Sequence, residues 1–433
     1  MVSDSWYCVQ FDHIVCNWFI RRRCRVKFIK IPIESLFQVN FEDSVLYDVT
    51  LSLKRKAFLK HIALLKKPNI INMITKLQIK GKQDPAVMKV LFSLLSSVRS
   101  LEIEESNLSQ WMKNIKQLEP CLCELNINYC AIKVKTISEY CPFIQKLSLS
   151  FVTVVSDNSI LQSIASNCAH LRILYIKYLE YVSNVESDAD LTAFAEKCPQ
   201  LEELILNCHQ HTDQSVIALP QHCSRLKKLK LTWCNLTATS LIALSERGLP
   251  LEELNTIPRI PVPTAEIAAQ CAHTLSRIRL LVTQYIDGSV DDIYYAIQYM
   301  TGLRKLDLNS SEDHLLVPHL VCAGLESLTI RLYCSITPQR LNELVTGYVQ
   351  LCTLIIYNPT CSSQTVLVEL ARSCPHLQKV TLDTGNVTDE GVLALTAHCR
   401  QLRELYIPQT TVTEETVRQL AQHCRCLTTV ICV

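Results

Sequence analysis

The chain repeats one arrangement of apolar residues, which follows the pattern L-x-x-L-x-L. Leu201, Leu204 and Leu206 form one copy. The first apolar position of each copy falls at residues 74, 98, 122, 144, 171, 201, 226, 251, 275, 303, 325, 351, 377, 402 and 427, so copies follow one another about every 25 residues. A degenerate sixteenth copy begins at Leu46. The pattern therefore predicts a repeat protein rather than a set of separate globular domains.

Each repeat has two halves with different hydrophobic periods. Leu204 and Leu206 alternate as in a strand, whereas the apolar run near residue 395 has helical spacing. Thr388, Asp389 and Glu390 precede that run and predict a capped helix start, because such side chains accept hydrogen bonds from the free N–H groups of the first turn. One repeat is thus strand, loop and helix, with a length typical of leucine-rich repeats.

Stacking of these repeats determines the expected fold. A single repeat cannot bury both its strand and its helix, so neighbours must share one core. Parallel strands lie about 4.8 Å apart and helices are about 10 Å wide, so the stack bends with its strands inside. We expect an α/β leucine-rich-repeat solenoid, a horseshoe with a parallel concave sheet and convex helices. Residues 46–433 supply about 15–16 repeats, and residues 1–45 precede them as an N-terminal helical cap.

Half of the 22 cysteines recur at fixed places in the repeat. One set ends the helix, and a smaller set follows the strand. Both places turn toward the core, where a free cysteine acts as a small apolar side chain. We therefore interpret these thiols as structural. The first set is Cys141, Cys168, Cys198, Cys223, Cys271, Cys374, Cys399 and Cys424, and the second is Cys130, Cys208 and Cys234.

The repeats resemble the cysteine-containing leucine-rich-repeat family. The segments CPQLEELILNC from Cys198 and VTDEGVLALTAHC from Val387 show its spacing, and the resemblance covers about Ile74 to Val433. In that family the repeats are most often the substrate-binding half of F-box proteins. The resemblance implies a substrate-recognition subunit of an SCF-type E3 ubiquitin ligase, which acts in ubiquitination and proteasomal turnover with a Skp-type adaptor and a cullin. The alternative is a non-ligase adaptor or scaffold, since other members lack the F-box.

The N-terminal residues fit an F-box only in part. Val15, Cys16 and Trp18 resemble its Val-Cys-x-x-Trp element but stand one residue too close together. A segment from Ile31 resembles the F-box opening, yet it follows that element instead of preceding it. Residues 1–45 are therefore either a degenerate F-box remnant, with Val15, Cys16 and Trp18 as the adaptor-binding part, or the helical cap.

Catalytic and cofactor motifs are missing. Only 8 of 433 residues are glycine, and neither GxGxxG nor GxxxxGK followed by Ser or Thr occurs. HExxH, GxSxG and CxxC are absent too, so we expect no catalytic residue, no cofactor and no metal. One cluster has the residue types that zinc prefers, but its cysteines take ordinary buried positions and its first two histidines lie in a loop. It comprises Cys208, His209, His211, Asp213, His222 and Cys223.

The net charge and the lack of a recognisable targeting signal limit the classes of partner and the compartment that we expect. The net charge is +2, which gives no global reason to expect nucleic acid or a membrane as partner. No window of about 18 residues is apolar and uncharged, and the N-terminus does not read as a secretory signal. We expect a cytoplasmic or nuclear protein with reduced thiols.

The candidate binding surface is the concave face, where the variable positions of the strand segment point. Basic residues gather in the central repeats, and apolar or aromatic residues follow toward the C-terminus, a combination typical of interfaces. The copy that starts at Leu275 places Arg279 at the middle variable position. We expect a protein partner with acidic or phosphorylated residues. The predicted partner-binding residues are Tyr175, Lys228, Lys230, Arg277, Arg279, Arg304, Arg331, Ile355, Tyr357 and Tyr406.

Overall fold

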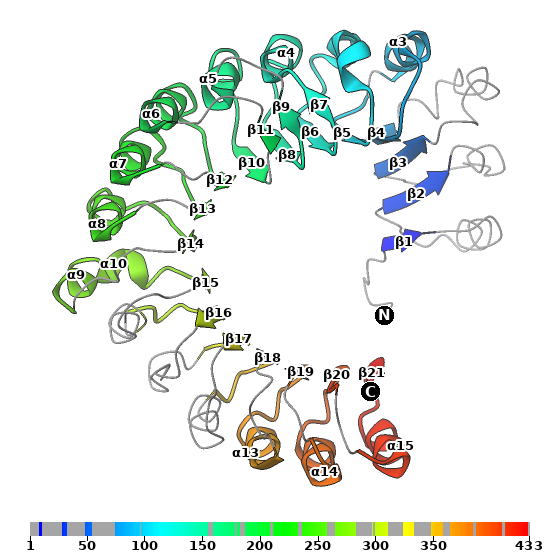
Figure 1. Ribbon diagram of the computed structural model, residues 1–433, viewed down its shortest axis with the longest axis vertical. Helices are drawn as coiled ribbons and strands as arrows, with labels where there is room; N and C mark the ends of the chain where they lie inside the picture. Colours follow the sequence, from blue (N-terminus) through cyan, green and yellow to red (C-terminus); the bar gives the residue numbers. More distant parts are fainter. Residues whose placement is uncertain are drawn as a thin grey trace, which may run out of the picture. The chain divides into compact units, whose positions relative to one another are not determined.

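The structure, a computed structural model, divides into two compact units, Met1–Asn207 and Cys208–Val433. It describes residues 8–10, 28–32, 48–53 and 74–431, without residues 96, 155–158, 178–179, 182–186, 208–210, 233–235, 258–264, 283–296, 298, 311–323, 333–347, 358–363, 384–386 and 409–411. In Figure 1 the strands of each unit lie on the inner side of its arc and the helices on the outer side. Each unit is therefore an α/β leucine-rich-repeat solenoid, as predicted, whereas the horseshoe shape of the whole chain stays a prediction.

The first unit is a run of parallel strands in chain order. Neighbouring strands pair along the whole run. The strands are β1 (Cys8–Gln10), β2 (Phe28–Pro32), β3 (Asp48–Leu53), β4 (Ile74–Lys80), β5 (Ser100–Glu104), β6 (Glu124–Asn128), β8 (Lys146–Ser150), β10 (Ile173–Lys177) and β12 (Glu203–Asn207). The helices are α3 (Pro85–Leu94), the 3-10 helices η3 (Leu108–Gln110) and η4 (Met112–Leu118), α4 (Val134–Tyr140), α5 (Ile160–Ala165) and α6 (Asp188–Lys197).

The second unit continues the same alternation, again with parallel pairing between successive strands. Its strands are β13 (Lys228–Thr232), β14 (Glu253–Ile257), β15 (Leu280–Val282), β16 (Lys305–Ser310), β17 (Ser327–Leu332), β18 (Thr353–Tyr357), β19 (Lys379–Asp383), β20 (Glu404–Tyr406) and β21 (Thr429–Ile431). Its described helices are α7 (Asp213–His222), α8 (Ala238–Glu246), α9 (Ala265–Gln270), α10 (Ala272–Leu275), α13 (Gln364–Ser373), α14 (Asp389–His398) and α15 (Glu414–His423). None of the helices that the structure describes combines the length and the apolar character of a membrane span.

The core is built from columns of equivalent apolar residues. The fourth position of the repeat is leucine from β4 to β12, and the register sets Leu77 opposite Leu101 and Leu174 opposite Leu204. These four side chains are fully buried. Burying one leucine contributes about 1.5–3 kcal/mol relative to leaving it exposed. The alternation predicted from the sequence is thus the main source of cohesion between repeats.

The register corrects two of the predicted copies. β15 pairs with β14 so that Leu281 lies opposite Leu254, which makes Ile278 the first apolar position of that repeat in place of Leu275. Leu275 instead ends α10 and is buried there. In β3, Leu51 lies opposite Leu77, so Leu51 takes the fourth position and not the sixth. The L-x-x-L-x-L match from Leu275 and that from Leu46 were both out of register.

The N-terminal segment contributes strands to the sheet. β1 and β2 lie within residues 1–45, and the register continues from Cys8 through Phe28 to Asp48. A purely helical cap is therefore wrong for residues 8–10 and 28–32. Val15, Cys16 and Trp18 lie outside the described residues, and the boundary at residue 45 stays a prediction.

The strand ends of the first unit turn a corner through left-handed backbone. Gly81, Glu105, Tyr129 and Phe151 occupy the same place after four successive strands, and all have positive φ angles, between 51° and 79°. After the last two corners the chain enters a second, small parallel sheet. Its strands are β7 (Ala131–Ile132), β9 (Thr153–Val154) and β11 (Glu180–Tyr181). Residues other than glycine rarely adopt positive φ angles. Two bulky aromatic residues nevertheless stand where the first of these repeats has glycine.

The repeat cysteines are buried and hydrogen-bonded to one another's backbone. All eight helix-ending cysteines are buried, as is Cys130, so the structural interpretation is confirmed for them. The Cys198 Sγ donates to the carbonyl oxygen of Cys168 at 3.7 Å, and the Cys424 Sγ to that of Cys399 at 3.6 Å. A thiol at this place therefore fills the core and also satisfies a carbonyl at the end of the preceding helix. Cys208 and Cys234 lie outside the described residues.

Successive helices are joined by carboxylates. The Asp213 carboxylate, in the first turn of α7, accepts hydrogen bonds from the Thr237 N–H at 2.8 Å and from the Thr237 and Ser240 hydroxyls at the start of α8. Asp389 of α14 accepts in the same way from Thr413, the N-cap of α15. The Thr388 side chain makes no cap hydrogen bond, so the capping predicted for Thr388 does not occur at the start of α14. We call the Asp–Thr contacts between neighbouring helices the helix clasps.

Thiol labelling should separate the two classes of cysteine. Burial raises the pKa of Cys168, Cys223, Cys374 and Cys399 to about 12, so in the native chain they hold little thiolate at neutral pH and should react slowly. Exposed Cys121 and Cys426 should react first, and the denatured chain should show all 22 thiols. Mass spectrometry after timed alkylation measures both. Fast labelling of the four buried thiols would contradict their structural role.

Removing one helix clasp should change stability in a pH-dependent way. Partial burial raises the pKa of the Asp213 carboxyl, but hydrogen bonds from Ser240 and Thr237 outweigh this, so the pKa lies below its ordinary value. Such a group stabilises the fold above its unfolded pKa of about 3.9 and loses that contribution as the pH falls through the lower folded pKa. Asp213→Asn should therefore cost about 1 kcal/mol or less at pH 7, because the site is half exposed.

Urea unfolding at pH 7 and at a pH of about 3 measures this difference, which should shrink at the lower pH. Glu414→Gln is the matched control. Glu414 also begins a helix, but its carboxylate holds no clasp to a following helix that the structure describes. Equal losses for both variants at both pH values would mean that only the charge at the helix end matters.

Candidate functional site

The strand face of the second unit carries the largest number of predicted site residues. The third, fifth and seventh positions of each repeat point away from the core, as the alternating burial of β18 shows. The register puts Ile355 opposite Thr381 and Thr381 opposite Tyr406 at the fifth position. Tyr357 lies at the seventh position, opposite Arg331. We call Arg331, Ile355, Tyr357 and Tyr406 the aromatic face.

The aromatic face holds its arginine in a fixed place. The Arg331 Nη1 lies 2.6 Å from the Asp307 Oδ1, across two adjacent strands. Its guanidinium carbon also lies 5.4 Å from the centroid of the Tyr357 ring on the next strand. An exposed cation–π contact of this kind contributes about 0.5–1 kcal/mol. Asp307, Arg331 and Tyr357 therefore form an ordered row across β16, β17 and β18.

The tyrosines of this face are open to solvent. Tyr357 is 36% exposed and Tyr406 is 39% exposed, while Ile355, two residues before Tyr357 on β18, is half-buried. Large aromatic side chains usually lose most of their exposure on folding, so their position on a strand face is informative. Tyrosine and arginine are the residue types most enriched at the centres of protein interfaces. The exposure predicted for Tyr357 and Tyr406 is confirmed.

The lysines of the strand face are more balanced by acids than the sequence suggests. Lys228 forms an ion pair with Glu253 at 3.2 Å, and Lys379 with Glu404 at 2.6 Å. Lys230 lies at the fifth position of β13. These partners come from the adjacent strand, so they could be identified only once the register was known. A strong positive field over this face is therefore not supported.

Three predicted arginines lie elsewhere. Arg304 stands at the second position, before β16 begins, and its N–H donates to the carbonyl oxygen of Arg279. Arg279 takes the same place before β15, and Arg277 lies in the turn after α10. The placement of these three on the concave face is wrong. For Arg277 and Arg279 the reason is that the copy from Leu275 was out of register, and for Arg304 it is that the second position of the repeat precedes the strand. They belong to the edge of the sheet where the strands start.

Tyr175 lies in the first unit, at the fifth position of β10. Its hydroxyl donates to Glu203, and the Lys177 Nζ lies 5.4 Å from its ring centroid. The structure therefore places Tyr175 on the strand face of its own unit, and the remaining predicted binding residues belong to the second unit. Within the first unit it is the counterpart of Tyr406.

The sequence analysis missed one aromatic pair. The rings of Tyr129 and Phe151 are stacked, with centroids 4.8 Å apart and an angle of 6° between their planes, and both are exposed. They stand at the left-handed corners after β6 and β8. The signal was an aromatic residue at the place where Gly81 stands in an earlier repeat.

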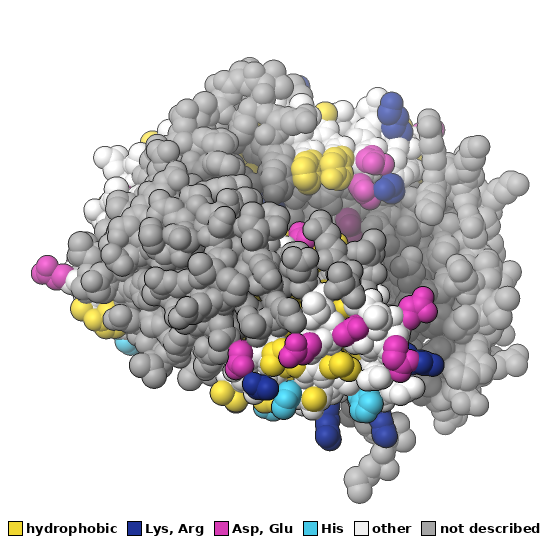
Figure 2. Space-filling view, turned by 60° about the horizontal axis from the view of Figure 1, so that its bottom comes forward, with side chains coloured by type: hydrophobic (Ala, Val, Ile, Leu, Met, Phe, Trp, Pro, Cys, Tyr) yellow, Lys and Arg dark blue, Asp and Glu magenta, His cyan; other side chains and the backbone are white. Residues whose placement is uncertain are grey.

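Among the residues that the structure describes, the outer helical face of the second unit shows no comparable concentration of aromatic residues. Its exposed charges are mixed in sign, with Arg372 near Glu369 and Arg418 near Glu415. Figure 2 shows acidic, basic and histidine side chains scattered over the described part of the face that it draws. Leu393 on α14 is an exposed apolar residue of this face. Such a surface is typical of a solvated face.

The cluster of zinc-type residues between Cys208 and Cys223, for which we expected no metal, cannot be assembled from the described residues. His211 and Cys223 are buried, whereas Cys208 and His209 lie outside the described residues. Among the residues that the structure does describe, no group of three or more His, Cys, Asp or Glu side chains is placed to hold a metal ion. The expectation that the cluster is structural stays a prediction.

Neither a protein-family model nor a curated protein matches the sequence. Solved structures that resemble the chain are leucine-rich-repeat proteins at low identity. An internalin from Listeria monocytogenes is 14% identical, with 86% of this chain and 93% of that chain covered and a TM-score of 0.44. A leucine-rich-repeat protein from Leptospira interrogans is 14% identical, with 98% and 100% covered and a TM-score of 0.47.

Toll, in the Toll–Spätzle complex from Drosophila, is 11% identical, with 84% of this chain and 50% of that chain covered and a TM-score of 0.43. Similarities of this size say nothing about function. Any functional argument must therefore come from the residues of this chain itself.

Proposed function

We propose that this chain is a non-catalytic protein-recognition solenoid whose aromatic face binds a partner protein. The observation that carries the proposal is the exposure of Tyr357 and Tyr406 on a strand face, with Arg331 already held by Asp307 and the Tyr357 ring. Ordered side chains lose little conformational freedom when a partner binds, which favours affinity. The leucine-rich-repeat fold suits this use because it spreads one continuous surface over many repeats.

The finer proposal is that the chain serves as the substrate-recognition subunit of an SCF-type ubiquitin ligase. Its support is the spacing of the cysteine-containing repeats, which the resemblance rests on. In this role Val15, Cys16 and Trp18 contact a Skp-type adaptor, and the protein works in the cytoplasm or nucleus. A non-ligase adaptor or scaffold has the same support from the repeats. We do not propose nucleic acid as a partner, because the small net charge predicts none.

Tyrosine truncation on the aromatic face should weaken partner binding. Tyr357→Ala and Tyr406→Ala should each cost about 1–3 kcal/mol, mainly through faster dissociation, because each removes a large contact surface. Partners captured from cells by the wild-type chain and identified by mass spectrometry supply the binding assay, and surface plasmon resonance gives the dissociation rate. Leu393→Ala, an exposed apolar change on α14, is the control. Loss of binding in the control, with both tyrosine variants intact, would contradict the proposal.

The ligase proposal is tested by the N-terminal segment. Affinity purification of the full chain should recover a cullin and a Skp-type adaptor, and the double variant Val15→Asp, Trp18→Ala should lose both while partner proteins remain. Substitution is preferable to deletion of residues 1–45, because β1 and β2 lie in that stretch and pair with the sheet. Tyr357→Ala should show the reverse result, with the adaptor kept. Partner recovery without any cullin from the wild-type chain would favour the scaffold.

A further inference from the structure

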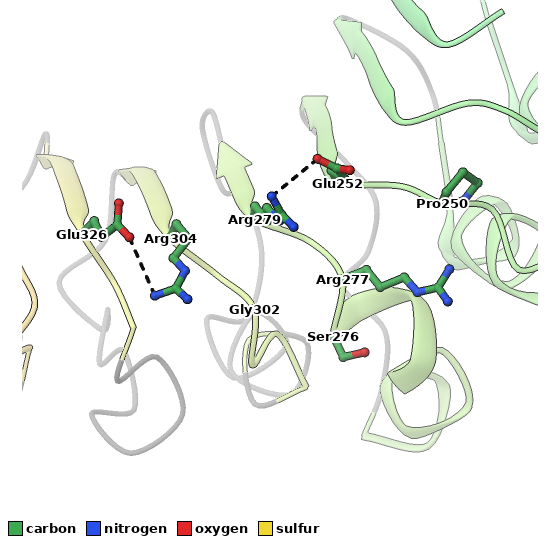
Figure 3. Close-up of a pocket in the computed structure, with 8 residues that line it drawn as sticks. All are labelled: Pro250, Glu252, Ser276, Arg277, Arg279, Gly302, Arg304 and Glu326. Atoms are coloured by element: carbon green, nitrogen blue, oxygen red, sulfur yellow. Dashed lines mark ion pairs between the residues drawn. The ribbon is translucent and has the colours of Figure 1, made fainter. Parts of the chain in front are cut away.

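The edge of the second unit holds a basic pocket that the aromatic face does not include. The pocket has a volume of about 700 Å³ and lies where the chain enters β15, β16 and β17. Figure 3 shows Arg277, Arg279 and Arg304 around it, together with Glu252 and Glu326. The guanidinium groups of Arg279 and Arg304 turn toward Glu252 and Glu326, whereas that of Arg277 points to the other side, toward Pro250. We call this the edge pocket.

The arginines of the edge pocket are only loosely engaged. Arg279 lies 3.9 Å from Glu252 and Arg304 lies 3.7 Å from Glu326, and both distances are longer than a hydrogen bond. Arg277 is exposed and forms no ion pair with the residues that the structure describes. Ion pairs between half-exposed side chains are worth little. Most N–H donors of these three side chains therefore remain open to a ligand.

Gly302 lines the pocket, and Gly324 lies beside one of its arginines, in a chain that has only 8 glycines. A Cβ on Gly302 would stand 2.6 Å from the carbonyl oxygen of Ser276, so only glycine allows the two segments to come this close. A Cβ on Gly324 would stand 2.6 Å from the Arg304 Nη1, which donates to the Gly324 carbonyl oxygen at 3.0 Å. Because Gly324 has no side chain, there is room for the Arg304 guanidinium, and the hydrogen bond to the Gly324 carbonyl oxygen holds it at the pocket.

Two adjacent arginines, Arg279 and Arg304, distinguish this edge from the positions that follow in the same column. The second positions continue through Cys352, Gln378, Arg403 and Thr428, linked by backbone hydrogen bonds. Arg403 is the one base among these four, and its column neighbours are uncharged. A solvated edge accounts for Arg403. A solvated edge does not explain why three arginines line one pocket together with Gly302, with Gly324 beside Arg304.

Building on the proposed function, we propose that the edge pocket binds the phosphate group of a phosphorylated side chain on the partner protein. Guanidinium groups present paired N–H donors that match the oxygens of a phosphate, and arginine is favoured where such recognition is needed. A phosphate offers more oxygens and more charge than a carboxylate, so it can accept from the N–H donors that Arg279 and Arg304 leave open, while Arg277 adds positive charge to the same pocket. Glu252 and Glu326, being half exposed, turn to solvent when it enters.

The test uses the purified full chain and a fluorescein-labelled peptide in which one phosphoserine is flanked by alanines and glycines. Fluorescence anisotropy should show binding of this peptide, and at least tenfold weaker binding of its unphosphorylated and glutamate-substituted forms. Arg277→Ala, Arg279→Ala and Arg304→Ala should each weaken binding about tenfold. Arg403→Ala, which removes the same charge from the same column, should leave binding unchanged. Thermal unfolding confirms that each variant is folded.

A second variant tests the geometry without a change of charge. Gly324→Ala should displace the Arg304 guanidinium and weaken binding of the phosphoserine peptide several-fold, because the added Cβ meets only the end of a flexible side chain. Inorganic phosphate should compete with the peptide, and sulfate or chloride at the same ionic strength should compete less. Equal competition by all three salts would mean charge screening and would overturn the proposal. So would peptide binding that is insensitive to Arg277, Arg279 and Arg304.

This result can be separated from that of the proposed function. If Tyr357→Ala loses the partner while the phosphoserine peptide fails to bind the wild-type chain, the edge pocket proposal falls and the aromatic face stands. If the peptide binds at the edge pocket but both tyrosine variants keep the partner, the aromatic face falls instead.

Discussion

The structure depends on one carbonyl oxygen in each repeat that accepts two hydrogen bonds from the next. The carbonyl of Arg279 accepts from the N–H groups of Arg304 and Lys305, at 2.9 Å each, and the carbonyl of Gln378 accepts from Arg403 and Glu404 in the same way. This shared acceptor fixes the register where the strand begins. A slip of one residue would turn every side chain of the strand to the opposite face. The separation between core, strand face and edge follows from it.

The consequence is clearest for the charged residues. Two arginines with the same chemistry differ in role according to their place in the register. Arg331, at the seventh position, lies over Tyr357 on the strand face. Arg304, at the second position, lies before its strand and against Gly324. The basic residues of the central repeats therefore do not form one patch: some belong to the aromatic face and others to the edge pocket.

Sequence periodicity was sufficient for the fold because each strand repeats a physical requirement, an apolar residue facing the core at alternate positions. It failed at the repeat near Leu275 for an equally physical reason. Leu275, Ile278 and Leu280 match the pattern better than Ile278 and Leu281 followed by Thr283, yet Leu275 is used by a helix. Only the pairing with β14 decides between the two. Contacts between neighbouring repeats, such as Lys228 with Glu253, were likewise out of reach.

Gly302, Gly324 and the residues at the left-handed corners depart from the repeat pattern, and each departure has a local structural reason. At Gly302 the chain needs space for the backbone of Ser276, and at Gly324 for the guanidinium of Arg304. At Tyr129 and Phe151 the backbone takes a conformation that costs an ordinary residue about 1–2 kcal/mol. The corner itself is structural, since it leads into β7 and β9, but the choice of two stacked, exposed aromatics is not required by it. Departures from the repeat therefore indicate function more strongly than the repeat itself does.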